Sequence, residues 1–342
     1  MKQPLPPFSC TYSPSLPELL WKLGCTLAIS TYQAGKLIFI SARSPENLVQ
    51  LCRDFPKPMG LAVSGERIAV ATRDKVVLLA NTPAQESSNS PQPEGSDGVY
   101  VPQATYFCGE VNTHDLVWGK EGLWAINTLF SSLALIEDGS GFEPQWRPSF
   151  VSDLAPEDRC HLNGMAMVNG RPQYVSALGR TDTLQGWRPN KASGGILIDV
   201  SSGEIVLADL PMPHSPRVCD GKLYLLLSAT GELVYVDVEK GNYEVVTRLP
   251  GFVRGMARYD DYLFIGLSRM RTKSPTFGDM AIAQQSVFSG IAVVYLPDGH
   301  IVGHLKYETS CEEIYDVQVL PGLREPGLVG VSQSDHRHAM ST

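Results

Sequence analysis

Six segments of this chain repeat one pattern, and this repetition constrains the fold more than any other feature. Each copy has a small residue, an apolar pair, a turn, and an apolar run that ends in a small polar residue. Five copies are complete: PMGLAVSGERIAVAT (58–72), HDLVWGKEGLWAINT (114–128), NGMAMVNGRPQYVSA (163–177), HSPRVCDGKLYLLLSA (214–229) and RGMARYDDYLFIGLS (254–268). The sixth begins at YDVQVLPG (315–322) and has no clear continuation toward the C-terminus.

The missing part of the sixth copy lies at the other end of the chain. Segment 26–60 matches segment 222–255 nearly element for element. Each interval of about 40 to 60 residues holds four apolar runs separated by turn signals, which is typical of a propeller blade. We therefore expect an all-β fold, a six-bladed β-propeller. N-terminal strands should join the C-terminal inner strand in one blade and so close the ring.

This interpretation makes residues 1–342 one propeller domain. The innermost strands should start near the positions that open the six copies: Met59, His114, Asn163, His214, Arg254 and Tyr315. These positions are equivalent, so they should ring the mouth of the channel on one face. Polar groups at the start of a buried strand are costly unless they have partners, so their presence in four consecutive blades indicates a site.

Further polar residues should join this ring, because side chains two positions apart on a strand point the same way. His161 precedes Asn163 by two residues, and Glu313 precedes Tyr315 by two. Asp115 and Asp316 should lie one residue deeper.

Three imidazoles at one mouth, His114, His161 and His214, are typical of a metal centre with an open ligand position. A divalent metal ion is the expected cofactor, with zinc favoured and iron, manganese or copper also compatible with these ligands. Two alternatives remain open. The histidines could act directly in catalysis or ligand binding, or each could be hydrogen-bonded separately as part of the structure.

Two long loops on the same face, 178–194 and 268–290, should cover the site. Arginines on and near these loops could bind an anionic substrate, or they could pair with neighbouring acidic residues such as Asp153, Glu157, Asp158 and Asp182. The expected substrate-binding residues are Arg147, Asn163, Trp187, Arg217, Arg269 and Tyr315.

The favoured hypothesis is a metal-dependent enzyme of the lyase, hydrolase or isomerase type. Its substrate would be a small anionic metabolite or a modified peptide. Glu313 or Asp115 could orient a ligand imidazole or act as general base, and Arg254 would hold the anionic end. The first alternative is a metal-free binding or acid–base site that uses the same residues. The second is a protein-interaction scaffold.

Charge and cysteine content limit the partners and the compartment. The net charge of −8 and the absence of a basic tract argue against nucleic acid and anionic membranes. The N-terminus has no apolar signal region, and the seven cysteines are scattered without a C-x-x-C pair. These features favour a cytoplasmic protein with reduced thiols.

Long motifs resemble a conserved bacterial family of unknown function, frequent in cyanobacteria and proteobacteria. The motifs are WRPSFVSDLAPEDRCHLNGMAM, MPHSPR, LPGFVRGMA, STYQAGKL and EEIYDVQVLP. This resemblance implies one fold along the chain and transfers no activity. In architecture the chain is similar to two groups of six-bladed propellers. Gluconolactonase and regucalcin-like propellers hold a divalent cation through Glu, Asn and Asp. Peptide-amidating lyases hold zinc through three histidines, which is the closer likeness.

Overall fold

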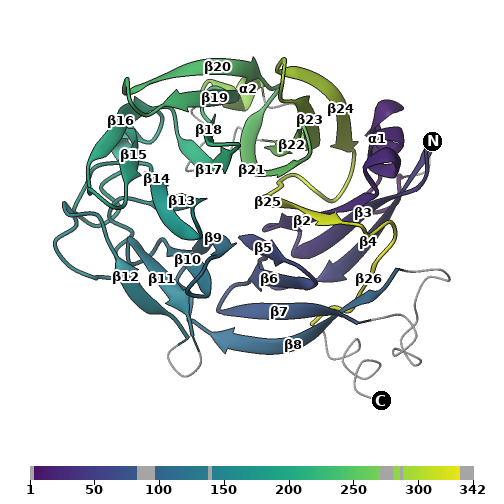
Figure 1. Ribbon diagram of the computed structural model, residues 1–342, viewed down its shortest axis with the longest axis horizontal. Coiled ribbons are helices and arrows are strands. Elements are labelled where there is room, and N and C mark those ends of the chain that lie inside the picture. The colour runs from purple at the N-terminus through teal and green to yellow at the C-terminus, as the bar shows by residue number, and fades with distance from the viewer. Residues whose placement is uncertain (1–3, 83–96, 138–140, 270–279, 286–287, 332–342) are drawn as a thin grey trace.

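Six antiparallel sheets stand around a central channel (Figure 1). The structure is a computed structural model that describes residues 4–82, 97–137, 141–269, 280–285 and 288–331. In five of the sheets the strand nearest the channel pairs with the next strand along the chain, and the outer strands follow in order. This arrangement is a six-bladed β-propeller, so the fold predicted from the repeats is confirmed.

Blades 1 to 5 follow one another along the chain, each with four strands from the channel outward. Blade 1 has β5 (Leu61–Ser64), β6 (Arg67–Ala71), β7 (Lys75–Thr82) and β8 (Val99–Phe107). Blade 2 has β9 (Thr113–Trp118), β10 (Leu123–Asn127), β11 (Ser132–Ile136) and β12 (Glu143–Trp146). Blade 3 has β13 (Leu162–Val168), β14 (Arg171–Ala177), β15 (Gly195–Asp199) and β16 (Ile205–Leu210). Blade 4 has β17 (Pro213–Cys219), β18 (Lys222–Leu227), β19 (Glu232–Asp237) and β20 (Asn242–Arg248). Blade 5 has β21 (Phe252–Tyr259), β22 (Tyr262–Ser268), β23 (Ser289–Tyr295) and β24 (His300–Tyr307).

Blade 6 joins the two ends of the chain, as predicted. Its innermost strand is β25 (Asp316–Pro321), and its other strands are β2 (Cys25–Thr31), β3 (Lys36–Ser44) and β4 (Asn47–Asp54). The yellow β25 lies beside the purple β2 in Figure 1, and the register places Ile29 opposite Val317. All six inner strands start within two residues of the predicted positions.

Three terminal elements extend neighbouring blades, and the sequence did not predict them. Strand β1 (Cys10–Tyr12) pairs with the outer edge of β24, and β26 (Gly327–Leu328) pairs in parallel with β8. Helix α1 (Ser15–Leu23) packs against β3 and β24, because Leu16 and Leu20 lie one turn apart and are fully buried. It ends at Gly24, whose positive φ of 61° suits a left-handed cap.

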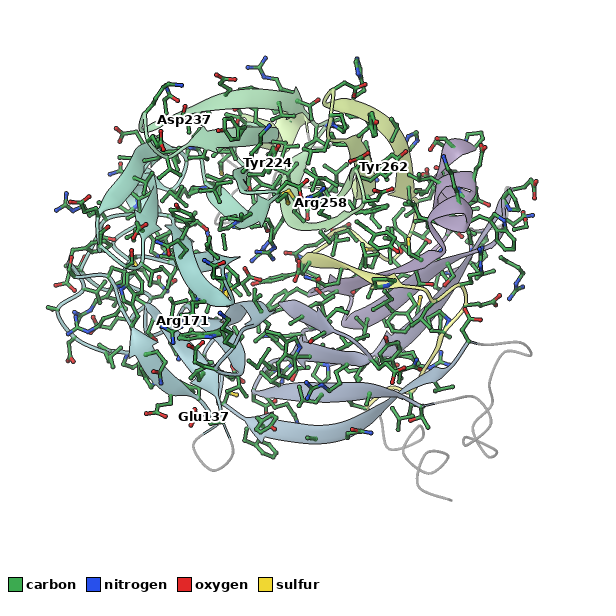
Figure 2. The ribbon with its side chains drawn as sticks, in the orientation of Figure 1. Glu137, Arg171, Tyr224, Asp237, Arg258 and Tyr262 are labelled. Atoms are coloured by element: carbon green, nitrogen blue, oxygen red, sulfur yellow. The ribbon has the colours of Figure 1, made fainter. Side chains whose placement is uncertain are left out.

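Apolar side chains from adjacent blades fill the space between the sheets (Figure 2). The small polar residue that ends several copies of the repeat has a shared role across these interfaces. Its hydroxyl donates to the carbonyl at or just before the start of the next inner strand, from Ser30 to Met59, Thr128 to Leu162, Ser228 to Val253 and Ser268 to Ile314. These bonds connect consecutive blades at the face where the inner strands begin.

The two α-helices in the described part of the chain are short. The longer, α1, has nine residues, and α2 (Ile282–Gln285) has four. No helix within the described ranges combines the length and apolar character needed to span a membrane.

Candidate functional site at the mouth of the channel

Side chains from five consecutive blades gather at the end of the channel where the inner strands begin. The ring of His114 lies 4.8 Å from that of His161 and 5.7 Å from that of Tyr315, measured between centroids. The guanidinium carbon of Arg254 lies 3.5 Å from the centroid of Tyr315. His214 is close enough to interact electrostatically with Arg254 and His161. We call these five residues the mouth cluster.

The imidazole of His114 is held in one tautomer. Its Nδ1 lies 3.0 Å from the carbonyl oxygen of Asn112 and 2.7 Å from the hydroxyl of Thr128. The Thr128 hydroxyl already donates its proton to the carbonyl of Leu162 at 2.6 Å. Both neighbours of Nδ1 are therefore acceptors, so Nδ1 carries the proton and Nε2 keeps its lone pair.

His214 repeats this arrangement two blades away. Its Nδ1 lies 3.0 Å from the carbonyl oxygen of Met212 and 2.8 Å from the hydroxyl of Ser228. The Ser228 hydroxyl donates to the carbonyl of Val253 at 2.6 Å, so it too accepts from the imidazole. The same residue types at the same spacing thus fix the same tautomer in blades 2 and 4.

His161 is oriented by a carboxylate. Its Nδ1 lies 3.0 Å from both oxygens of Asp158, and the indole Nε1 of Trp187 donates to the same carboxylate at 3.1 Å. The Trp187 ring also packs on the imidazole, with centroids 4.3 Å apart. His161 and Asp158 both have left-handed φ values, 53° and 49°, which non-glycine residues rarely adopt. Such backbone strain is found most often at functional sites.

The three Nε2 atoms have no partner among the described residues. No hydrogen bond there reaches Nε2 of His114, His161 or His214. Each Nε2 therefore keeps a lone pair that the described part of the chain does not use.

Burial keeps two of the imidazoles neutral. Desolvation lowers the pKa of His114 well below 6.5, and the neighbouring charges of His161 and Arg254 lower it further. Desolvation also lowers the pKa of His214 well below 6.5, followed by the positive charge of Arg254. Both rings are uncharged at neutral pH, which agrees with their tautomers.

Arg254 has hydrogen-bonding capacity to spare. Its Nη1 donates to Glu313 Oε1 at 3.3 Å, and the guanidinium stacks on Tyr315. Among the described residues no other acceptor contacts Arg254, although a guanidinium has five N–H groups. The remaining N–H groups can bind an oxyanion, and the side chain is only 15% exposed.

Three further donors near the mouth are buried without a partner among the described residues: Asn163 Nδ2, the Tyr315 hydroxyl and Arg269 Nε. Asn163 uses its oxygen to accept from the Ser176 hydroxyl at 2.6 Å, which leaves its amide N–H groups unused. Buried polar groups in proteins are almost always hydrogen-bonded, so several unused donors in one region indicate a place for a ligand.

Asp115 and Arg217 do not belong to the mouth. Arg217 lies three residues beyond His214 in β17 and forms a two-point ion pair with Asp115, at 2.9 and 3.0 Å. Asp115 also accepts from the backbone N–H of Met165, and Asp316 accepts from that of Leu61. We call Asp115, Arg217 and Asp316 the channel triad. Its members face one another inside the channel, where Arg217 is engaged by Asp115.

The far end of the channel holds a separate cavity of about 770 Å³. Residues of all six blades line it, including Leu116, Met165, Arg217 and Met256. Arg258 on β21 also lines this cavity and lies toward the inside of the ring, whereas Asp237 lies on its outer side (Figure 2). Arg254 and Arg258 therefore mark opposite ends of one inner strand.

Several other predicted residues have local roles. Arg147 donates to the carbonyl of Val151 within its own loop. Trp187 is only 2% exposed and supports His161, so it does not offer an open surface to a substrate. Arg159 pairs with Glu157 and Asp182, as the alternative interpretation of the loop charges predicted.

The three histidines offer the kind of donor atom that metal ions bind, but the described placement of their side chains does not form a metal site. Neutral imidazoles whose Nδ1–H groups are bound to carbonyl or carboxylate oxygens are the usual form of histidine ligands. Among the described residues, however, no three His, Cys, Asp or Glu side chains are placed so that they could hold one ion. Ring contacts join His114 to His161, and His214 packs on Phe252 instead.

Sequence reasoning missed the residues that orient the imidazoles. Glu313 or Asp115 was predicted either to orient an imidazole or to act as general base; in the structure Asp158 orients His161, while Thr128 and Ser228 contact the other two rings. One signal was present in the sequence. Thr128 and Ser228 both lie 14 residues after their histidines, at the small polar position that ends the repeat.

Comparison with solved structures shows the fold. A chain in the crystal structure of a nidogen/laminin complex matches with a TM-score of 0.56 and 10% identity, covering 87% of this chain and 99% of that chain. At this identity the likeness concerns architecture alone. No curated protein sequence matches the chain.

A sequence family model covers nearly the whole propeller. The family described as "Domain of unknown function (DUF4915)" matches residues 14–329, from the start of the N-terminal helix region to β26. The match includes every residue of the mouth cluster and of the channel triad. The protein therefore belongs to the DUF4915 family.

Proposed function

We propose that the mouth cluster binds a small anionic molecule and supplies acid–base catalysis to it. The observation that carries this proposal is the unused bonding capacity at one point of the channel. Three imidazoles present Nε2 atoms that no described residue uses, beside a guanidinium that has N–H groups to spare. A positively charged group with planar donors favours a carboxylate or phosphate group.

His161 has the arrangement of a general base. A proton accepted at Nε2 would make the ring an imidazolium, and the Asp158 carboxylate at Nδ1 would stabilise that charge. Trp187 holds the carboxylate from the other side and excludes water from it. Lyase, isomerase and hydrolase reactions all require such a proton transfer.

Anion binding can be measured by calorimetry with succinate and with inorganic phosphate at pH 7.5. We expect at least one of them to bind the wild-type protein and to lose most of its affinity in Arg254→Met. Arg258→Met is the matched control, because Arg258 lies on the same strand at the other end of the channel and pairs with Asp220. Equal losses in both variants, or no binding to wild type, would overturn the proposal.

A divalent metal ion at the three imidazoles is the second candidate function. The tautomers favour it, because all three histidines offer Nε2 as the donor atom. His114, His161 and His214 would hold the ion, which would supply Lewis acidity. The described placement of these side chains does not form such a group, so it would have to adjust on binding.

Cobalt(II) titration separates the two candidates. A three-histidine site would take up one equivalent and give visible absorption bands, and His214→Phe would abolish them. If wild type takes up no stoichiometric cobalt or zinc, the metal-dependent hypothesis is wrong and the metal-free site stands alone.

A further inference from the structure

The polar atoms of the mouth also limit what kind of anion can bind there, and this step rests on the proposed function. The unused acceptors are the three Nε2 lone pairs, and the unused donors belong to Arg254, Asn163 and Tyr315. A ligand that fills the mouth must satisfy both sets, because polar atoms left unpaired in a desolvated site cost binding free energy.

A bare anion satisfies only the donors. Carboxylate and phosphate oxygens that carry no proton are acceptors, so they can bind Arg254 but offer nothing to an Nε2 lone pair. The Nδ1 contacts of His114 and His214 place the ring proton on Nδ1 and leave a lone pair on Nε2, so these nitrogens accept and do not donate. The ligand must therefore bring its own hydrogen-bond donors to the imidazoles.

Charge decides against an ammonium group as that donor. The guanidinium of Arg254 already places a positive charge 3.5 Å from the Tyr315 ring, which itself lies 5.7 Å from the His114 ring, so an added cation at the same place would be repelled. The acidic side chain that contacts Arg254, Glu313, is already paired with it. A neutral donor is favoured.

A hydroxyl group fits this environment best among neutral donors. It can donate to Nε2 and accept at the same time from one of the remaining N–H groups of Arg254. An amide N–H can donate to the imidazole but cannot itself accept a hydrogen bond. Since His114 and His161 lie together and His214 packs elsewhere on Phe252, one hydroxyl cannot serve all three rings.

We infer that the mouth takes a small carboxylate bearing at least two hydroxyl groups. The carboxylate lies on the free N–H groups of Arg254, and the hydroxyls donate to the Nε2 atoms of the imidazoles. Such ligands are hydroxy acids, and the histidines would be the residues that recognise their hydroxyl groups.

Succinate, malate and tartrate test this directly, because they share one carbon chain and two carboxylates and differ by zero, one and two hydroxyls. With EDTA-treated wild-type protein at pH 7.5, calorimetry should give affinities that rise along this series. We expect tartrate to bind about tenfold more tightly than succinate, or better, with a preference between its D and L forms. This series needs no variant, so it remains decisive if a substitution impairs folding.

Substitutions then assign the preference to the imidazoles. His114→Phe and His214→Phe keep ring volume but remove Nε2, so tartrate should lose affinity while succinate keeps or gains it. Arg254→Met should weaken all three acids together, because it removes the shared carboxylate contact.

Failure of the proposed function and failure of the hydroxy-acid inference would give different results. If none of the three acids and no phosphate binds, the proposed function itself fails. If succinate binds as tightly as tartrate, anion binding stands and the hydroxy-acid inference is overturned. It is also overturned if both histidine variants retain the full preference, or if tartrate is preferred only after zinc is added, because chelation would then explain the selectivity.

Discussion

The channel holds two groups of polar side chains that differ in how completely they are hydrogen-bonded. In the channel triad both carboxylates are engaged: Asp115 binds Arg217 and the N–H of Met165, and Asp316 accepts from the N–H groups of Leu61 and Val317. These contacts connect inner strands of different blades. In the mouth cluster, by contrast, each imidazole uses one nitrogen for the protein and leaves the other open.

From this difference we expect the channel triad to stabilise the fold and the mouth cluster to bind a ligand. Groups whose bonds all end within the protein hold the ring of blades together, so their loss should reduce stability. Groups with open capacity stabilise the fold little and are available to a ligand, so their loss should reduce binding. The same residue types, Arg217 in one group and Arg254 in the other, allow the two roles to be compared directly.

The largest effect is expected for Arg217→Met. The side chains of Arg217 and Asp115 are only 17% and 4% exposed, so the substitution leaves a buried carboxylate without its partner. The free energy of unfolding should fall by about 3–5 kcal/mol in urea titrations. Arg254→Met, which breaks a single-point pair, should cost about 1 kcal/mol. Similar losses in the two variants would contradict the comparison.

The channel triad should also make stability depend on pH. The pKa of Asp316 is raised to about 7, mainly by burial and then by the nearby Asp115 carboxylate, with Arg217 opposing the rise. The unfolded state therefore loses this proton first, near pH 4, so the stabilisation is present below pH 4 and is lost as pH rises through 7. Relative to Asp316→Asn, wild type should lose on the order of 2–4 kcal/mol between pH 4 and 7. If the unfolding free energies of wild type and Asp316→Asn differ by the same amount at pH 4 and at pH 7, this prediction is wrong.

The mouth cluster should show the opposite pH dependence. The pKa of His214 is lowered well below 6.5 by burial, so the unfolded state takes up a proton before the folded state does. This contribution is present above pH 6.5 and is lost as pH falls. Wild type should therefore be destabilised by acid more steeply than His214→Phe, as measured by thermal unfolding between pH 7.5 and 5. Parallel curves would show that His214 is not held neutral.

Two aspartates allow a third comparison: Asp158 lies in the loop before β13, and Asp182 lies in the loop after β14. Asp158→Asn removes the carboxylate shared by His161 and Trp187, and unfolding free energy should fall by about 1.5–3 kcal/mol. Asp182→Asn on the covering loop removes a pair whose carboxylate is 35% exposed, so the change should stay within about 1 kcal/mol. Nitrogen-15 NMR should show a mixture of His161 tautomers only in Asp158→Asn. An unchanged tautomer there would exclude Asp158 as the positioning residue.

The sequence predicted the ring and the starts of the inner strands because the repeat itself encodes them. It also placed His114, His161 and His214 at one mouth, since equivalent positions in a propeller lie around one axis. It could not predict which polar side chains pair, because Arg217 and Asp115 are 102 residues apart and meet only through the curvature of the ring. Helix α1 was missed because it belongs to no repeat.

The misplacement of Trp187 has a similar cause. A tryptophan on a long loop is compatible with an exposed binding residue and with a buried support, and the sequence carries no signal that separates them. The loop folds back so that the ring packs on His161 and the indole N–H reaches Asp158. The orientation of His161 therefore depends on contacts behind the imidazole, which periodicity does not encode.

The smallest expected effect concerns the hydroxyl behind His114. Thr128→Val keeps the side-chain shape but removes the acceptor at Nδ1 and the donor to Leu162, so unfolding free energy should fall by about 1 kcal/mol. The matched control is Thr72→Val, because the Thr72 hydroxyl donates to the carbonyl of Lys75 and, within the described ranges, bonds no histidine. If the hydroxyl serves mainly to orient the imidazole, Thr128→Val should also weaken tartrate binding severalfold, whereas Thr72→Val should leave it unchanged. Equal binding in the two variants would mean that the Asn112 carbonyl alone fixes the His114 tautomer, and the shared hydroxyl would then belong with the structural contacts of the channel rather than with the mouth.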